Sequence, residues 1–272
     1  MQMEGALLEF APEKKLRPLL KWAGGKRWAI PYLLPMWNRH ANRRLVEPLC
    51  GGLAVTFGLR PRRALLNDVN VHLVNFYKQV KSGLTVSITM ENEKETYYLN
   101  RDRFNELIKV DRWNTPEAAQ LFYYLNRTGY NGLCRFNSSG LYNVPFGRYN
   151  KINYMQDFHE YKTALSGWDF LSGDFSGVKI EDNDFVYVDP PYDVDFRQYS
   201  SGGFFWKDQV RLAKWASSLR VPVAISNQAT ERVVELYKDL GFSIQLVEVP
   251  RFINSVGTGR GSVKEVLGTR GF

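Results

Sequence analysis

The sequence predicts an α/β fold built on a mostly parallel sheet, with a mainly helical segment inserted into it. Short apolar runs of strand character alternate with stretches of helical periodicity, as is typical of parallel strands joined by crossover helices. The first clear runs lie at residues 45–47, 64–68 and 185–188. The middle of the chain loses this alternation. We therefore expect a discontinuous α/β domain of residues 13–83 and 169–272 around an inserted recognition domain of residues 84–168.

The charge distribution indicates a polyanionic partner. The 272 residues carry a net charge of +8 and 14% aromatic side chains. Residues 13–63 hold twelve Lys or Arg against two acids, and residues 251–272 hold four against one. Basic blocks beside Gly-rich loops are typical of nucleic-acid binding, and aromatic rings supply stacking surfaces for bases.

Cysteine usage and the lack of long apolar runs predict a cytoplasmic protein. Cys50 and Cys134 lie far apart in no metal-ligand spacing, so we expect free thiols and neither a disulfide nor a metal site. No run approaches the roughly 20 apolar residues that span a bilayer, so we expect no membrane contact. A nucleoid-associated location would suit a nucleic-acid partner, and the protein could be phage- or prophage-encoded.

The first functional candidate is the Gly-Gly-Lys loop at residues 24–26, which follows Trp22. Two glycines permit a tight turn that brings the backbone close to a ligand. The loop lacks the upstream glycine of a P-loop, and Arg27 stands where a P-loop has Ser or Thr. It therefore favours an anion or a charged small molecule other than ATP.

The next two strands have the order of a nucleotide-binding unit. The first leads into a turn at Gly51 and Gly52 and then a helix at 53–59, and the second ends at Asp68 before a helix at 69–81. In this arrangement backbone amides approach a ligand closely, and the acid after the second strand receives ribose hydroxyls. A G-x-G-x-x-G pattern is absent, which argues against a dinucleotide.

The inserted segment has the composition of loops that contact the bases of a nucleic acid. Residues 116–125 predict a helix, and residues 125–149 are rich in Gly, Asn and Arg. Asn and Arg form hydrogen bonds to base edges, whereas a segment so rich in them makes poor core.

The third part is organised around Asp189-Pro190-Pro191-Tyr192, which follows the strand at 185–188. The prolines fix φ and leave carbonyl groups in defined directions. An acid, fixed carbonyls and an aromatic ring at the end of a strand make a pocket for a flat ligand that bears an amino group. Four residues alone also fit a strand that ends in a proline-rich turn.

The rest of the chain restores the α/β alternation. We expect Thr230 as the N-cap of a helix that Gly241 ends, and an antiparallel strand pair at the sheet edge with a basic loop between its strands. The expected elements are a helix at 207–219, a strand at 221–226, a helix at 230–240, strands at 242–249 and 263–267, and the loop at 253–261.

These motifs together resemble the Dam-type DNA adenine-N6 methyltransferases. The resemblance covers nearly the whole chain in the order of the α group of amino-methyltransferases. It is carried by LKWAGGKR, VEPLCGG, LLNDVN, LNRTGYNGLCRFN with NVPFGRY, and DPPY. It implies a Rossmann-like methyltransferase sheet and methyl transfer from S-adenosylmethionine to N6 of adenine in double-stranded DNA, within GATC.

The resemblance also implies roles for residues near the cofactor and the reacting amine. Trp22, Lys26, Asp68 and Asp189 would contact the cofactor or close its pocket, with Glu47 and Gly51 as further candidates. For the reaction, three residues are implied. Asp189 and the Pro190 carbonyl would accept hydrogen bonds from the amino group, and Tyr192 would stack on the base.

For sequence readout, the resemblance implies contacts with successive base pairs. Lys21 would approach the first guanine, with Tyr149 at the same pair, and Arg135 would read the guanine opposite the last cytosine. Leu133 and Pro145 would contact a thymine methyl group.

The target adenine must leave the duplex to be methylated. The resemblance implies that Tyr130 wedges into the base stack and that Asn131 fills the space left behind. The loop 193–203 looks shorter than in cellular relatives, and no obligatory protein partner is implied. Two alternatives stay open: an amino-methyltransferase for N4 of cytosine or for RNA, and a DNA-binding homologue without catalysis.

Overall fold

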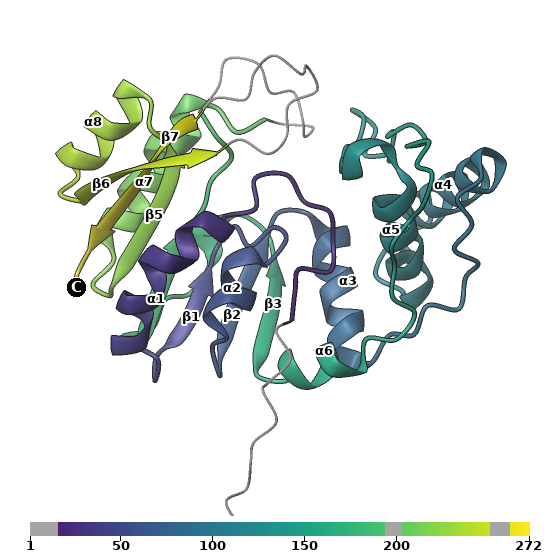
Figure 1. The fold of residues 1–272 in the computed structure, drawn as a ribbon, viewed down its shortest axis with the longest axis horizontal. Helices are drawn as coiled ribbons and strands as arrows, with labels where there is room; N and C mark the ends of the chain where they lie inside the picture. The colour runs from purple at the N-terminus through teal and green to yellow at the C-terminus, as the bar shows by residue number, and fades with distance from the viewer. Residues whose placement is uncertain (1–15, 194–202, 251–261) are drawn as a thin grey trace, which may run out of the picture.

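The computed structural model describes residues 16–193, 203–250 and 262–272 (Figure 1). The basic loop expected at 253–261 lies outside the described residues, as do the first fifteen residues and nearly all of the loop after Asp193. No helix within the described ranges has the length and apolar character needed to cross a bilayer.

A seven-stranded sheet with the order β3-β2-β1-β4-β5-β7-β6 forms the centre of the molecule. The first five strands are parallel, and β7 runs antiparallel to both β5 and β6. The strands are β1 (Arg44–Glu47), β2 (Ala64–Asp68), β3 (Trp168–Ser172), β4 (Asp184–Val188), β5 (Val223–Gln228), β6 (Ser243–Pro250) and β7 (Ser262–Arg270). The predicted mostly parallel α/β fold is confirmed.

The strand order reverses between β1 and β4, since β1 pairs with β2 on one side and β4 on the other. In register, Val46 of β1 lies beside Leu65 of β2 and Val186 of β4. Open α/β sheets bind ligands outside the carboxyl ends of the strands at such a reversal. A site is therefore expected at the carboxyl ends of β1 and β4. The edge of the sheet formed by the carboxyl ends of its parallel strands is called the catalytic edge below.

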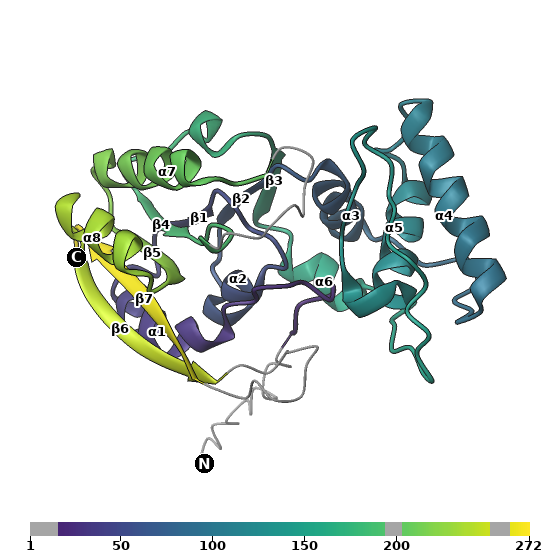
Figure 2. The ribbon, with the colours of Figure 1, turned by 90° about the horizontal axis from the view of Figure 1, so that it is seen from above.

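Helices cover both faces of the sheet. The helical elements are η1 (Arg27–Ala29), α1 (Ile30–Arg39), α2 (Ala54–Leu59), α3 (Val71–Ser82), α4 (Lys94–Lys109), α5 (Pro116–Thr128), η2 (Tyr130–Gly132), α6 (His159–Ala164), η3 (Phe175–Gly177), α7 (Trp206–Ser218) and α8 (Glu231–Asp239). Neighbouring strand residues face opposite cores: Leu45 joins the core under α1, α2 and α3, and Val46 joins the core under α7 and α8. Figure 2 shows α7 on one side of the sheet and α2 on the other.

The helical segment shares a core with the sheet. Phe76 of α3 stacks on Tyr123 of α5, with ring centroids 5.4 Å apart and an interplanar angle of 7°. The same buried cluster continues to Phe104 of α4 and back to Leu45 of β1. Because one continuous core joins the two parts, α3 connects the sheet rigidly to the helices.

Helix α4 and strand β3 are among the elements that the sequence analysis did not predict. Helix α4 is rich in charged residues and buries only Tyr97, Phe104 and Leu107, so its apolar periodicity is weak. Strand β3 exposes Asp169 and Leu171 on one face and lies at the edge of the sheet. Both elements are held by contacts with distant parts of the chain rather than by a strong local pattern.

Of the two predicted end signals of α8, the glycine after the helix has the expected conformation, and the N-cap side chain lacks the expected hydrogen bond. Gly241 follows the helix with φ of +78°, the left-handed conformation expected after a helix end. Thr230 stands at the N-cap, but its side chain makes no capping hydrogen bond. The predicted strand pair near the end of the chain is present, with β6 at the edge and β7 between β6 and β5.

Candidate active site and nucleic-acid interface

Three acidic residues meet where neighbouring parallel strands end. Glu47 closes β1, Asp68 closes β2, and Asp189 directly follows β4. Since β4 and β2 flank β1, the order of the strands brings these residues to one edge, although they are far apart in sequence. The predicted cofactor and catalytic motifs therefore converge at the strand-order reversal.

Asp189 is held by two donors on the same oxygen. Lys26 Nζ lies 2.7 Å from Asp189 Oδ1, and Ser226 Oγ donates a hydrogen bond to that oxygen over 3.2 Å. The Lys26 side chain is 3% exposed and the Asp189 side chain 21%. Burial raises the pKa of Asp189, and Lys26 and Ser226 oppose this shift by stabilising the carboxylate.

The two residues at the end of the predicted pocket motif are also fixed. The Tyr192 hydroxyl donates to Glu265 Oε1 on β7, and Lys26 Nζ lies 4.3 Å from the centre of the Tyr192 ring. Gln209 Nε2 donates to the Pro191 carbonyl over 2.7 Å. The aromatic ring is thus anchored beside the Asp189 carboxylate, with the Lys26 ammonium group between them.

Asp68 organises the glycine turn. Its two carboxylate oxygens accept from the backbone amides of Gly51, over 3.0 Å, and Asn70, over 2.9 Å. Burial raises the pKa of Asp68, and these amide hydrogen bonds oppose the shift. The Trp22 side chain lies against the turn so closely that a Cβ at Gly52 would come within 2.7 Å of Trp22 Cβ. Only glycine fits there, so the Trp22 side chain lies directly against the turn.

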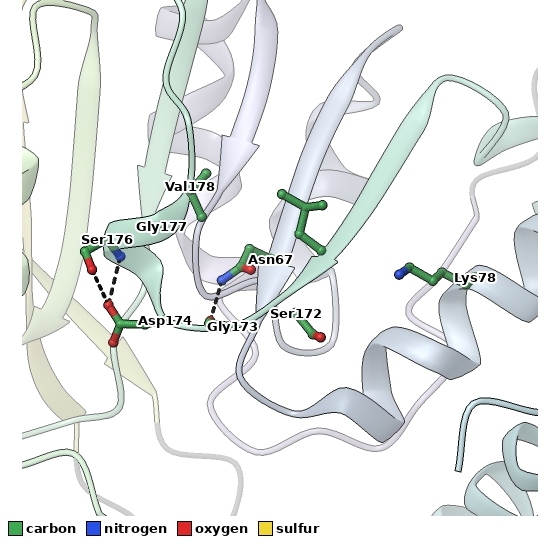
Figure 3. Close-up of a pocket in the computed structure, with 9 residues that line it drawn as sticks. Asn67, Lys78, Ser172, Gly173, Asp174, Ser176, Gly177 and Val178 are labelled. Atoms are coloured by element: carbon green, nitrogen blue, oxygen red, sulfur yellow. Dashed lines mark hydrogen bonds between the residues drawn. The ribbon is translucent and has the colours of Figure 1, made fainter. Parts of the chain in front are cut away.

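A cavity of about 550 Å³ lies at the ends of β2 and β3, with Asn67 of β2 in its lining. Figure 3 shows the Asn67 amide directed at the Gly173 carbonyl, and Asp174 bonded to Ser176. Sequence reasoning missed this wall, which is formed mainly by residues 171–178, because it missed β3. In residues 168–174 (WDFLSGD), apolar and polar residues first alternate and a Ser-Gly-Asp run follows, which was a signal for a strand that ends in a turn.

Glu47, the last residue of β1, is buried beneath the carboxyl ends of the parallel strands. Thr56 Oγ1 donates a hydrogen bond to Glu47 Oε1. Burial raises the pKa of Glu47 to about 8, and the nearby negative charge of Asp189 adds to the shift. Glu47 is thus mainly protonated at neutral pH and adds little negative charge to the site.

Lys21 connects the sheet to the helical segment. Its backbone amide and carbonyl are both bonded by the Asn126 side chain, over 2.9 and 2.8 Å. Its ammonium group donates to the Arg127 carbonyl over 3.0 Å and lies 3.7 Å from the centre of the Tyr149 ring. Lys21 and Tyr149, predicted to approach one base pair, are therefore in contact. Burial, with the charge of Arg127, lowers the pKa of Lys21.

The loop after α5 presents Tyr130 and Asn131 to solvent. The Tyr130 amide donates to the Pro145 carbonyl over 2.9 Å, and the Tyr130 side chain is 46% exposed. Asn131 has φ of +52°, and Gly132 has φ of +61°. A Cβ at Gly132 would come within 2.4 Å of Lys21 Cβ, so the turn is packed against Lys21. Tyr130, Asn131 and Pro145 share one exposed surface beside Lys21.

Arg135 is oriented by its neighbour across the loop. Asn143 accepts from Arg135 Nε over 2.8 Å through its side chain, and from Nη2 over 3.2 Å through its backbone carbonyl. Leu133 is half-buried, and its carbonyl accepts from the Tyr142 hydroxyl over 3.0 Å. Between them, Cys134 accepts from Asn70 over 3.3 Å, which links the loop to the turn that Asp68 organises.

The basic block at residues 13–63 divides in space. Lys21, Lys26 and Arg27 lie at the carboxyl edge of the sheet. The arginines at positions 39, 43, 44, 60, 62 and 63 precede or begin β1 and β2, and so lie at the opposite edge. Arg44 there pairs with the buried Asp184, with Nη2 2.8 Å from Oδ2. The block in the sequence is therefore not one surface patch.

Comparison with known proteins gives consistent matches over most of the chain. The pattern of the family described as D12 class N6 adenine-specific DNA methyltransferase matches residues 22–252. The type II methyltransferase M1.LlaDCHI of Lactococcus lactis subsp. cremoris is 37% identical over 93% of this chain and 95% of its own length. The DNA adenine methylase of Escherichia coli strain K12 is 36% identical over 93% of this chain and 95% of its own.

A phage protein and a solved structure are also similar. The DNA N-6-adenine-methyltransferase of Escherichia phage P1 is 32% identical over 94% of this chain, which spans 36% of that longer protein. A putative RNA methyltransferase from Pyrococcus horikoshii aligns with 96% of this chain and 91% of its own at 10% identity and a TM-score of 0.42.

Proposed function

Because the chain belongs to the D12 class of N6 adenine-specific DNA methyltransferases, we propose that it methylates N6 of adenine within GATC in double-stranded DNA, with S-adenosylmethionine as the methyl donor. The observation that carries this proposal is the arrangement of Asp189 and the Tyr192 ring beside the turn that Asp68 organises. One edge of the sheet thus offers a place for an amine next to a place for a nucleoside.

The residues at the glycine turn fit the cofactor. Asp68 keeps lone pairs for the ribose hydroxyls after accepting one amide hydrogen on each oxygen, and the cavity at the ends of β2 and β3 has room for the adenine ring. Trp22 and Lys26 border the same edge. The cofactor supplies a methyl group on a positively charged sulfur. The protein's part is to orient this methyl group and to exclude water from it.

Asp189 and Pro190 would activate the amino group of adenine. This nitrogen is a weak nucleophile because its lone pair is delocalised into the ring. Asp189 Oδ2 and the Pro190 carbonyl would accept its two hydrogens, which localises the lone pair on nitrogen. The Pro191 carbonyl is already bonded to Gln209, which favours Pro190 as the acceptor. Tyr192 would stack on the base, as its anchored ring permits.

Base flipping would bring the adenine to this pocket. A base inside a duplex is out of reach of Asp189, and extruding it costs a few kcal/mol of pairing and stacking. Tyr130, exposed on the loop, would enter the stack, and Asn131 would fill the space left by the base. The exposure of the Tyr130 and Asn131 side chains supports these roles.

The recognition contacts would come from the segment 84–168 together with Lys21. Lys21 and Tyr149 would read the first base pair, and Arg135 would donate two hydrogen bonds to the guanine opposite the last cytosine. Leu133 and Pro145 would contact a thymine methyl group. The contact between Lys21 and Tyr149, and the fixed Arg135 guanidinium, support these assignments.

The test is methylation of defined duplexes with a labelled methyl donor, followed by nucleoside analysis. The protein should produce N6-methyladenine in a duplex that contains GATC and none in a duplex in which that sequence is scrambled. A GATC duplex already methylated on both strands is the matched control. N4-methylcytosine, or preferential methylation of RNA, would overturn the proposal.

A further inference from the structure

The Asp189 carboxylate receives its two described donors on one oxygen, Oδ1. Oδ1 receives both Lys26 Nζ, at 2.7 Å, and Ser226 Oγ, at 3.2 Å. Ser226 belongs to β5, which pairs with β4 so that Val188 lies beside Ile225. A strand neighbour therefore reaches the carboxylate from the interior of the sheet, on the side away from solvent.

The Ser226 hydroxyl has a partner of its own. It lies 2.8 Å from the Tyr187 hydroxyl, and both side chains are almost completely buried, at 0% and 1% exposed. A serine hydroxyl has one hydrogen. When Ser226 donates it to Asp189, Tyr187 must be the donor to Ser226. Burial raises the pKa of Tyr187, which keeps its hydroxyl protonated and able to donate.

We propose that Ser226, oriented by Tyr187, is a positioning residue that fixes the Asp189 carboxylate so that Oδ2 receives the amino group of the substrate. This inference rests on the proposed adenine methylation. The terminal torsion of an aspartate is broad, and one donor on Oδ1 leaves the carboxylate plane free to rotate. A second donor from a different direction restricts that rotation.

The direction of the two donors explains why both are needed. Lys26 comes from the loop before η1 and carries a flexible side chain, whereas Ser226 is fixed in a buried strand. Lys26 also lies over the Tyr192 ring, where the base would stack, so its contact with Asp189 must adjust when the base enters. Ser226 would hold the carboxylate throughout, and an acceptor held in advance requires no reorganisation during the reaction.

The test is a double-mutant cycle on the full chain, with single-turnover methylation of a GATC duplex at saturating cofactor and DNA. We expect S226A to lower the rate about 10- to 100-fold and Y187F to lower it several-fold, with DNA and cofactor dissociation constants within about threefold of wild type. Because Tyr187 acts through Ser226, the double variant should be no slower than S226A.

Two further readouts separate positioning from a general effect on the fold. Loss of the Ser226 donor raises the pKa of Asp189, so the acidic limb of the rate profile should move to higher pH in S226A. The titratable groups that remain beside Asp189 are Lys26 and, on β1, Glu47, which is mainly protonated at neutral pH. S226T should restore both rate and profile. Y123F, which removes a buried hydroxyl within the helical segment, is the matched control and should keep the wild-type rate.

Each outcome bears on one of the two proposals. An active wild type with S226A at the same rate, or additive losses in the double variant, would overturn the positioning role alone. If S226A does not fold, Y187F decides, and a wild-type rate for that variant would count against the chain of donors. A wild type that forms no N6-methyladenine overturns the proposed function and this inference with it.

Discussion

The catalytic edge of the sheet and the loop of residues 125–149, called the reading loop here, are built in opposite ways. At the edge, Asp189 follows a strand whose five residues are all buried, and its partners come from the neighbouring strand β5 and from one loop. In the reading loop the backbone is irregular, with positive φ at Asn131, Gly132 and Arg148. That loop is stabilised by backbone hydrogen bonds across it and by side chains that bond its backbone.

This difference shows how the two tasks place different demands on the chain. Methyl transfer needs acceptors fixed within fractions of an ångström, and regular strands hold them at that precision. Base readout needs donors and rings that project into solvent, and irregular backbone can present them. Tyr97, for example, supports the loop by donating its hydroxyl hydrogen to the Val144 carbonyl over 2.8 Å. Substitutions in the two regions should therefore alter different measured quantities.

The largest effect is expected at the catalytic edge. D189A removes the proposed acceptor of the substrate amine, so single-turnover methylation should fall at least about 10³-fold. Affinity for a GATC duplex, measured by fluorescence anisotropy, should stay within a few fold because the reading loop is untouched. D169A, at an acid 73% exposed on β3, is the control. Near-normal turnover in D189A would refute the assignment.

A smaller effect, confined to specificity, is expected in the reading loop. R135A removes the proposed donor to one guanine, and discrimination at that base pair should fall by about 1–3 kcal/mol, which corresponds to roughly 5- to 150-fold. Competition among duplexes that differ at single positions of GATC measures this loss. Substitution of an exposed rim lysine such as Lys151 should instead weaken binding to all duplexes alike. An unchanged sequence profile in R135A would rule out the readout role.

Acid should lower the stability of the fold through a histidine at the junction of the two regions. His72 of α3 is buried and stacks on Phe136 of the reading loop, with centroids 4.9 Å apart, and burial lowers its pKa to about 4 from 6.5. The unfolded chain therefore binds a proton that the folded chain excludes, so stability is lost as pH falls from 6.5 through 4. The cost is about 2 kcal/mol at pH 5.

The variant H72F should lose this dependence. Urea unfolding at pH 5 and pH 7 would measure it, and the difference between the two free energies of unfolding should shrink by about 2 kcal/mol relative to wild type. If H72F kept the full acid dependence of the wild type, His72 would not be its source.

The smallest effect tests the contact between the reading loop and Lys21. G132A imposes φ of +61° on a residue with a side chain and brings its Cβ against Lys21, so affinity for GATC should fall about tenfold. G140A is a matched control, because Gly140 also has positive φ, at +72°, but nothing within 4 Å of an added Cβ. Equal losses in both variants would mean that backbone strain, and not Lys21, is responsible.

Local sequence patterns were sufficient to predict most of the sheet and the motifs at its edge. Strands β1, β2 and β4 are short apolar runs, and Asp68 and Asp189 stand directly at strand ends, so their meeting at one edge follows from parallel pairing. The run of Asn, Gly and Arg around Tyr130 was recognisable as irregular because such residues are poor core.

Tertiary structure alone decided which side chains support those motifs and where the charge lies. Ser226 and Glu265 reach Asp189 and Tyr192 from strands that are adjacent in space but distant in sequence, and no local periodicity encodes such a pairing. The basic block near the amino terminus belongs to two opposite edges because the chain crosses the sheet between its arginines. Local patterns record which face or end of an element a residue occupies, whereas contacts between elements depend on how the whole chain packs.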